Sequence, residues 1–112
     1  MSRARRERLV TFRPGTVLFR PSDECRGFLA VRKGRIKVSL TGLSGREIVL
    51  YRVQPGDICL QTFGCLAEAR RYSAEGVAES EVVAELIPSS EFERRMTTDG
   101  AFRAEVFSAI AR

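Results

Sequence analysis

Apolar and polar positions alternate along short stretches of this chain, and turn signals separate the stretches. In the stretch 35–41, Ile36, Val38 and Leu40 alternate with polar residues, which predicts a strand with one buried face. The stretch 47–53 is apolar on both faces and predicts a more central strand. Further strands are predicted at 17–19, 28–32, 72–79 and 81–87. We therefore expect about seven strands in all.

Turn signals indicate how these strands connect. Lys33-Gly34 separates two strand-like stretches by two residues and predicts a β-hairpin. Gly34 and Gly56 stand where a tight turn needs positive φ or a close backbone approach, and Pro55 preorganises the second turn. Many short strands in succession predict a mainly-β sandwich, barrel or jelly roll rather than alternating β and α units.

The pattern becomes helical after Pro88. Ser89 and Ser90 precede Glu91, which predicts a short helix capped by a hydroxyl group. Asp99 is a natural N-cap for a second helix that runs to the end of the chain. The apolar stripe of this second helix consists of Phe102, Val106, Ala109 and Ile110, widened by Phe107. Two interpretations stay open, because such a stripe docks on its own sheet or meets a partner helix.

The composition is that of one globular domain. The chain has 112 residues, of which 44% are hydrophobic and 29% are charged, and both shares are ordinary for a globular protein. No apolar run approaches the ~20 residues that a membrane span needs, and no apolar segment typical of a signal peptide follows the first residues. We therefore expect a cytoplasmic protein with no membrane partner.

The sequence contains no histidine, and this narrows its chemistry. Without imidazole there is no histidine base, no Ser-His or Cys-His pair and no histidine ligand for a metal or haem. We therefore expect no enzyme activity, no metal site and no His-ligated haem. The net charge is +5, of which residues 1–8 carry +3. This basic arm is either a nucleic-acid patch or, as we favour, a flexible end that aids solubility.

The chain has three cysteines, Cys25, Cys59 and Cys65, and no export signal. A disulfide framework is therefore not expected, and three thiolates fall short of the four ligands that an iron–sulphur cluster usually takes. Cys59 and Cys65 are a candidate redox pair, because Cys65 would lie in the first turn of a helix at 63–69, where the helix dipole lowers a thiol pKa. The favoured alternative is that all three are small buried apolar residues.

Several motifs occur in an order that resembles a known family. The most specific is Pro55-Gly56-Asp57-Ile58 after Arg46-Glu47-Ile48-Val49-Leu50. The others are Phe12-Arg13-Pro14-Gly15-Thr16-Val17-Leu18-Phe19, Phe28-Leu29-Ala30-Val31-Arg32-Lys33-Gly34-Arg35-Ile36-Lys37-Val38, Ala78-Glu79, Ile87-Pro88-x-x-x-Phe92 and the helix from Phe102. In this order they resemble the N-terminal, cyclic-nucleotide-binding-like sensor domain of Crp/Fnr-type bacterial transcription regulators.

The resemblance implies a fold and a domain organisation. The fold is mainly β, a double-stranded β-helix (jelly roll) with short flanking helices and the start of a C-terminal dimerisation helix. The implied boundaries are a basic flexible arm at 1–8, the β-roll domain at 9–98 and the dimerisation helix at 99–112. The family's DNA-binding helix-turn-helix is absent from this chain. The implied partners are a second copy through the C-terminal helix, an effector, and DNA only through the absent domain.

The segment that binds the ligand in this family, called the ligand cassette below, is altered in this sequence. The family pattern is Phe-Gly-Glu followed by Arg-Ser-Ala, in which the Glu holds the ribose and the Arg holds the phosphate. Matching Phe63-Gly64 puts Cys65 at the Glu position, matching from the Pro-Gly-Asp turn puts Leu60 there, and matching Ser73-Ala74 puts Tyr72 at the Arg position. Each lost charged hydrogen bond costs about 1.5–3 kcal/mol, so cyclic nucleotide binding would weaken roughly 10²- to 10⁴-fold.

Alternatives at this cassette stay open. A shift of one residue would bring Arg70 or Arg71 to a phosphate, whereas we favour a solvated basic turn for both. A helix at 63–69, capped by Thr62, would bind an anion at its N-terminus, and the other interpretation is a packed loop with no ligand. The candidate ligand-binding residues are Phe63, Gly64, Cys65, Leu66, Arg70, Arg71, Tyr72 and Ser73.

These observations lead to two functional hypotheses. The first is the sensor domain of a Crp/Fnr-type regulator that does not respond to cyclic AMP and couples a small ligand or a redox signal to the dimer helix. The alternative is a stand-alone cyclic-nucleotide or small-ligand binding module that acts on a protein partner.

Overall fold

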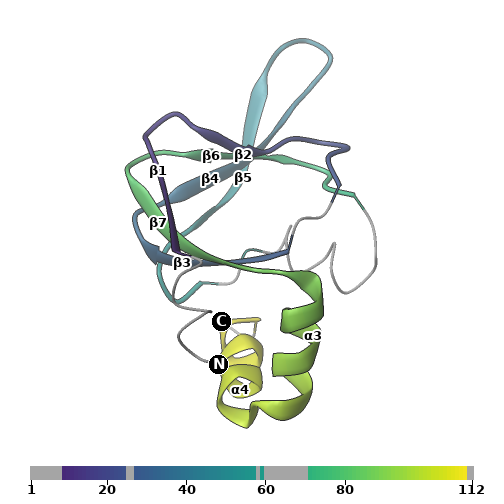
Figure 1. Ribbon diagram of the computed structural model, residues 1–112. Helices are drawn as coiled ribbons and strands as arrows, with labels where there is room; N and C mark the ends of the chain where they lie inside the picture. Colours follow the sequence, from purple (N-terminus) through teal and green to yellow (C-terminus); the bar gives the residue numbers. More distant parts are fainter. Residues whose placement is uncertain (1–8, 25–26, 58, 60–70, 111–112) are drawn as a thin grey trace.

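Seven strands and two helices make up the described part of the chain (Figure 1). The computed structural model describes residues 9–24, 27–57, 59 and 71–110. The strands are β1 Leu9–Phe12, β2 Val17–Phe19, β3 Phe28–Lys33, β4 Ile36–Thr41, β5 Glu47–Val53, β6 Glu75–Ala78 and β7 Val82–Ile87. The helices are α3 Ser89–Thr98 and α4 Gly100–Ile110. The predicted mainly-β fold with C-terminal helices is confirmed.

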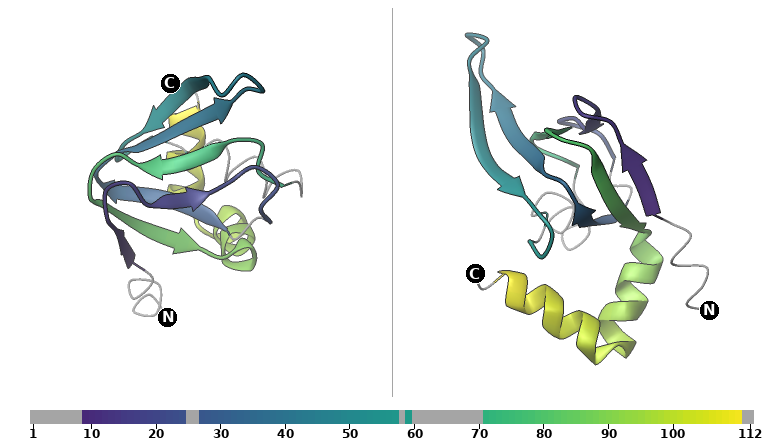
Figure 2. Two further views of the ribbon diagram at one scale, coloured as in Figure 1. Left: turned by 90° about the horizontal axis from the view of Figure 1, so that it is seen from above. Right: turned by 90° about the vertical axis from the view of Figure 1, so that its left-hand side faces the viewer.

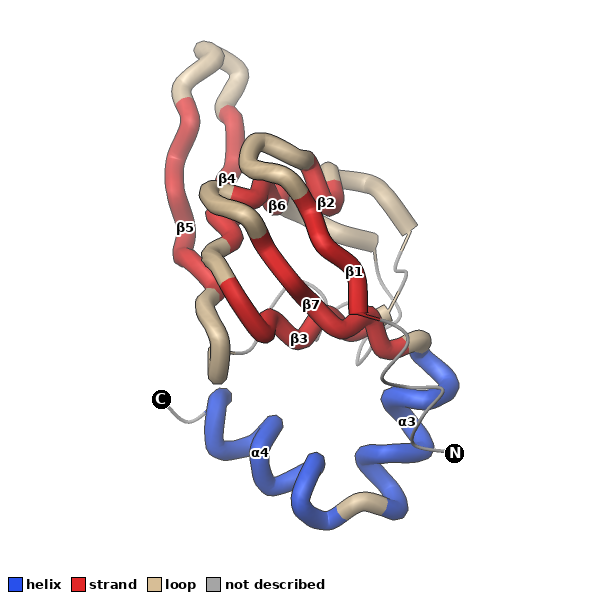
Figure 3. The backbone as a smooth tube through the Cα atoms, turned by 60° about the vertical axis from the view of Figure 1, so that its left-hand side comes forward, coloured by secondary structure: helices blue, strands red, loops and turns tan. Residues whose placement is uncertain are grey.

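The strands form two antiparallel sheets that pack face to face (Figure 3). One sheet has the order β1-β7-β3 and the other has the order β2-β6-β4-β5. The main core lies between them, where Ile36, Val38 and Val53 from one sheet meet Val82 and Ala84 from the other. The alternation predicted for the stretch 35–41 therefore produces a buried face, as expected of a jelly roll.

The turn at Gly34 connects the two sheets and does not form a hairpin within one of them. β3 pairs with β7, whereas β4 pairs with β5 and β6, so the hairpin predicted at Lys33-Gly34 is wrong. The turn packs against the one between β6 and β7. The Arg35 N–H donates to Ser80 Oγ at 3.1 Å, and the Glu79 N–H donates to the Arg35 carbonyl oxygen at 2.9 Å. The local sequence determines the tight turn, but the packing of the two sheets determines which strands pair with one another.

β5 is an edge strand, which corrects its predicted central position. In the described sheet it pairs with β4 alone. Ile48, Val49 and Leu50 are exposed by 54%, 39% and 44%. Apolar residues on both faces predict a central strand because such strands are usually covered on both sides. Here the β4–β5 hairpin extends past the rest of the roll instead (Figure 1).

The C-terminal helices begin where they were predicted, but one cap differs. α3 begins at Ser89 with Pro88 in the N-cap position and no side-chain cap bond, so the predicted hydroxyl cap is wrong. The Pro88 carbonyl oxygen accepts the Phe92 N–H at 2.8 Å, and the proline sets the direction in which the chain leaves β7. The predicted cap of α4 is confirmed, because Asp99 Oδ1 accepts the Phe102 N–H at 3.1 Å.

α4 docks on the domain itself through Phe102 and Val106. These side chains belong to a second buried cluster, separate from the main core and made of Phe28, Ile87, Phe92, Phe102 and Val106. Phe107 is 54% exposed, so it lies outside the face of α4 that packs on the domain. The helical period turns it about 100° away from Val106. The side chains of Ala109 and Ile110 lie outside the described residues.

None of the helices in the described ranges has the length and apolar character that a membrane span requires.

Candidate functional site

A small apolar cavity opens between the two sheets. Its volume is about 70 Å³ and it is lined by Val10, Phe12, Leu18, Phe19, Leu29, Tyr72, Ala84 and Leu86. This space exceeds what one water needs, and its lining contains no charged side chain. A cavity of this kind suits a small apolar group rather than an anion. Tyr72 is the one lining residue among the predicted ligand-binding residues, although the inward-facing positions of the short strands were a usable signal.

Tyr72 is a core residue on the wall of this cavity. It is 6% exposed, and its ring stacks on Phe19 with the ring centroids 4.6 Å apart. Its N–H donates to the Asp23 carbonyl oxygen at 3.2 Å, and its own carbonyl oxygen accepts the Ser22 N–H at 2.9 Å. The position that the resemblance assigns to a phosphate-binding arginine therefore holds an aromatic ring that packs into the core.

The flanking candidates, Arg71 and Ser73, are exposed. Arg71 donates from Nη1 to the Ser22 carbonyl oxygen at 3.0 Å and from Nη2 to the Glu24 carboxylate at 3.3 Å. Its side chain is 61% exposed, as in the predicted solvated basic turn. The other candidates lie outside the described residues, namely Phe63, Gly64, Cys65, Leu66 and Arg70.

Cys59 is fully buried and belongs to the main core. Cys25 and Cys65 lie outside the described residues, so the redox pairing of Cys59 with Cys65 stays a prediction. A thiol at this depth behaves first as a small apolar side chain. Within the described ranges, no three Cys, Asp or Glu side chains come together in a way that could hold a metal ion.

The chain also matches a family by sequence. The family model of the cyclic nucleotide-binding domain covers residues 9–99. The chain belongs to this family. A search of curated protein sequences finds no match.

Solved structures share the fold of this cyclic nucleotide-binding domain. The N-terminal domain of a transcriptional regulator from Streptomyces coelicolor A3(2) is 23% identical with a TM-score of 0.73, over 99% of this chain and 76% of that one. A transcriptional regulator from Thermotoga maritima is 17% identical with a TM-score of 0.77, over 92% and 79%. The EAL enzyme Bd1971 in its cAMP-bound form is 22% identical with a TM-score of 0.71. That match covers 86% of this chain and 26% of the enzyme.

One nearly buried carboxylate connects the sheet of this cyclic nucleotide-binding domain to its helices. Glu85 on β7 is 8% exposed, and its Oε1 accepts Arg32 Nη2 from β3 at 2.6 Å. Its Oε2 accepts Arg95 Nη1 from α3 at 3.4 Å. The Arg95 guanidinium carbon in turn lies 4.1 Å from the ring centroid of Phe102 on α4. A displacement of β7 would therefore act on both helices through a polar path that runs beside the second buried cluster.

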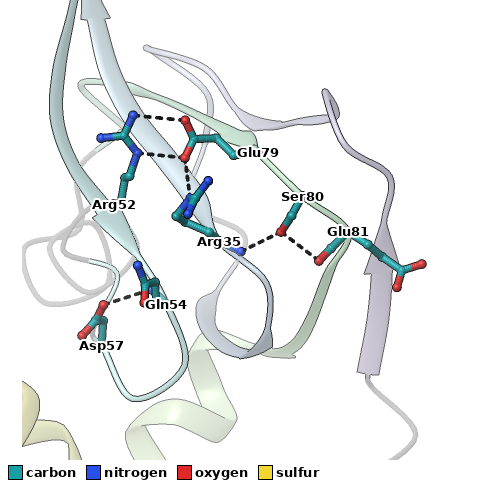
Figure 4. A network of polar contacts seen from close by, with 7 residues as sticks. All are labelled: Arg35, Arg52, Gln54, Asp57, Glu79, Ser80 and Glu81. Carbon is teal, nitrogen blue, oxygen red and sulfur yellow. Dashed lines mark hydrogen bonds and ion pairs between the residues drawn. The ribbon is translucent and has the colours of Figure 1, made fainter.

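A second carboxylate fastens the turn after β6 (Figure 4). Glu79 Oε1 accepts Nε of Arg35 and Nε of Arg52, both at 2.8 Å, and Oε2 accepts Nη2 of Arg52 at 3.2 Å. The two hydrogen bonds from Arg52, and then the one from Arg35, lower the pKa of Glu79 from 4.5 to about 2. The carboxylate thus links the start of β4 and the end of β5 to the turn between β6 and β7.

This lowered pKa predicts an acid-sensitive contribution to stability. The stabilisation from Glu79 is complete above its unfolded pKa of 4.5 and is lost as the pH falls toward about 2, because the unfolded chain binds the proton first. Glu79→Gln should therefore denature at lower urea concentration than the parent at neutral pH, and the difference should shrink between about pH 5 and pH 2. Urea denaturation at several pH values measures this.

Glu81→Gln is the matched control for this experiment. Its carboxylate is 56% exposed and has an ion pair with Lys33 at 3.4 Å. An exposed pair of this kind contributes little to stability, so the denaturation midpoint should change little across the pH range. A pH-independent difference between Glu79→Gln and the parent would contradict the assigned role of Glu79.

Proposed function

We propose that this cyclic nucleotide-binding domain is the effector-sensing part of a Crp/Fnr-type transcription regulator whose effector is not a cyclic nucleotide. The observation that carries the proposal is the position of Tyr72. A phosphate needs a guanidinium or a set of N–H donors at this point, whereas Tyr72 stacks on Phe19 inside the core. The domain has no catalytic role in this proposal and acts by binding.

The apolar cavity supports a small apolar effector. Residues of both sheets line it, with Phe12, Leu29 and Leu86 on one side and Leu18 and Phe19 on the other. A molecule held there would alter the spacing of the sheets, since packed interiors transmit small displacements. An oxidation event at the cysteines is the second kind of signal that we keep within this proposal.

The signal would pass from the sheet to α3 and α4. Glu85 and Arg95 join β7 to α3. Phe102 packs α4 into the second buried cluster, which also contains Ile87 of β7 and Phe92 of α3. An effector shifts the helices to the extent that it binds one arrangement better than the other.

α4 also supports the proposed homodimer. Its Ala101, Ala104, Phe107 and Ser108 are exposed, and small side chains beside one aromatic ring allow another helix to approach closely. In this proposal a second copy of the chain packs against that face. DNA would be contacted through a helix-turn-helix domain that is not part of this chain.

Calorimetric titration of the reduced domain with cyclic AMP tests the proposal. We expect no saturable binding, because a buried tyrosine offers no charged donor to the phosphate. Saturable binding with a micromolar or tighter constant would overturn the assignment of a non-nucleotide effector. Arg71→Gln is the matched variant. If the parent binds and this variant does not, the exposed Arg71 is the phosphate ligand and the domain senses cyclic nucleotides.

The alternative proposal is a binding module that regulates another protein. It is favoured by the structural likeness to the EAL enzyme Bd1971, which was solved in a cAMP-bound form. The coding sequence after Arg112 separates the two proposals. A helix-turn-helix in that sequence supports the regulator, and a different domain or a stop codon supports the module.

A further inference from the structure

The β4–β5 hairpin carries most of the exposed apolar surface in the described part of the chain. Eight large apolar side chains are exposed in the described residues. Five of them lie on this hairpin: Leu40, Leu43, Ile48, Val49 and Leu50. Leu43 at the tip is fully exposed. The hairpin residues 40–50 include two charged side chains, Arg46 and Glu47. Apolar surface of this kind, gathered in one element, is typical of an interaction site.

β5 also forms one edge of its sheet in the described part of the chain. It is the last strand of its sheet, and the right-hand view of Figure 2 shows it along the border of the roll. An edge strand presents unpaired N–H and C=O groups that can accept another strand, and proteins usually protect such edges with charges, prolines or short strands. β5 is seven residues long, has no proline and is apolar at its centre. Its two charged residues, Glu47 and Arg52, stand near its ends, so the stretch 48–51 between them carries no charge.

The bulge in β5 makes the strand self-complementary. Ile48 lies opposite Leu40 and Tyr51 lies opposite Val38, so Ile48 and Tyr51 share the inner face of the sheet. Glu47 and Arg52 lie opposite Thr41 and Lys37 and share the outer face. The register shift inserts one extra residue, Leu50, between these halves. Starting from the bond between residues 49 and 50, the second residue in either direction (48 or 51) faces inward, and the third (47 or 52) faces outward.

We propose that two copies of this chain associate by antiparallel pairing of β5 with β5 across a two-fold axis. In this register Val49 lies opposite Leu50 of the other copy at the centre. Ile48 lies opposite Tyr51 on the inner face, and Glu47 lies opposite Arg52 on the outer face. Both four-stranded sheets join into one continuous sheet, and the two-fold axis repeats every pair.

Charge complementarity favours a second copy over other occupants. The Glu47 and Arg52 side chains are 43% and 46% exposed, so both have room for a partner in addition to their contacts within the chain. Pairing in any register that shifts β5 by one residue would place inner-face residues opposite outer-face residues. The proposed register satisfies the faces and the charges together. It is also independent of the α4 surface, which contributes no residue to it.

Mixing two charge-reversed variants tests this register. In Glu47→Arg, two arginines face each other at both ends of the pair, and in Arg52→Glu, two glutamates do. Each variant alone should associate at least about tenfold more weakly than the parent. In an equimolar mixture an arginine of one variant faces a glutamate of the other at both ends, 47 opposite 52 at one end and 52 opposite 47 at the other, so association should return. Sedimentation velocity of the parent, each variant and the mixture measures this.

The mixture separates the contact between copies from damage within one chain. Loss of the Lys37 or Glu79 contacts inside a chain is the same before and after mixing, and so is any association through α4. If association does not return on mixing, or if the variants associate like the parent, the proposed register is wrong. A parent that is monomeric at high concentration, or joined through α4 alone, also overturns it.

Two lysine variants provide an apolar control. Leu50→Lys places two charges near the two-fold axis and should abolish the β5 association. Leu43→Lys changes an equally apolar and more exposed residue outside the paired stretch, and it should leave the association unchanged. Equal effects of the two variants would indicate that the hairpin binds through its tip or its general apolar character, and would contradict pairing through β5.

Discussion

Gly34→Ala is expected to lower the free energy of unfolding by about 3 kcal/mol or more, through backbone strain and steric overlap together. Gly34 has φ 89°, a conformation that costs an alanine about 1–2 kcal/mol. A Cβ at this position would also overlap the Glu81 carbonyl oxygen and approach Ser80 Oγ to 2.9 Å. The overlap is with backbone of the neighbouring turn, which moves only if the crossover between the sheets opens. Urea denaturation followed by circular dichroism measures the loss.

Gly45→Ala is the matched control, because Gly45 has φ 84° and its Cβ would meet nothing within 4 Å. This substitution carries the backbone strain without the overlap and should cost about 1–2 kcal/mol. The difference between the two variants then reports how tightly the turn at Gly34 packs against the turn before β7. Equal losses in the two variants would show that the two turns yield easily, and would contradict the packing argument.

Phe102→Ala is expected to cost about 3–5 kcal/mol, the usual range for removing a buried aromatic side chain. Phe102 is 7% exposed, and its ring meets Phe92 edge to face with centroids 5.9 Å apart. It also carries the Arg95 guanidinium at 4.1 Å. Removing the ring therefore weakens the cluster and the polar path from Glu85 at one point. Urea denaturation measures the stability, and hydrogen exchange should show earlier loss of protection in α4 than in β7.

Phe107→Ala removes the same side chain from the same helix on the exposed face. Because Phe107 is 54% exposed in the single chain, its removal should change the stability of the monomer by less than about 0.5 kcal/mol. Both variants replace a phenylalanine of α4 by alanine, so the change in helix propensity is the same in both and the difference between them isolates docking on the sheet. If Phe107→Ala destabilises the domain as strongly as Phe102→Ala, then α4 is held by its outer face, and the docking described for Phe102 and Val106 is wrong.

Local sequence patterns predicted where strands and helices lie better than they predicted which strands pair with one another. The alternation at 35–41 predicted β4, and Asp99 predicted the start of α4, because both signals act over a few residues. The central position predicted for β5 was wrong. An apolar residue on a strand shows that burial is favourable there, but not whether a second layer or another molecule supplies it. The hairpin predicted at Lys33-Gly34 was also wrong. A tight turn can lead the chain into a second sheet as well as back along the same sheet, and the local sequence does not distinguish the two.

At the candidate site, the motifs predicted the family but not the cavity. The motif order around Pro55-Gly56-Asp57 predicted the β-roll, and the family match confirms it. Tyr72 was identified as a departure from the phosphate-binding pattern, yet its stacking on Phe19 depends on β2, more than fifty residues earlier in the chain. The cavity is formed by side chains from strands far apart in sequence, and no local pattern contains that information.

The sequence by itself indicated where this chain turns, and it located both described helices and every described strand except β1. These properties follow from φ preferences, side-chain period and residue type, all of which act locally. The replacement of the phosphate anchors stays a prediction. Only the tertiary structure decided that β5 is an edge, that Tyr72 packs into the core, that Glu85 joins the sheet to α3, and that Phe107 faces outward. Each of these depends on which surfaces cover one another when the two sheets close, and long-range packing sets that arrangement.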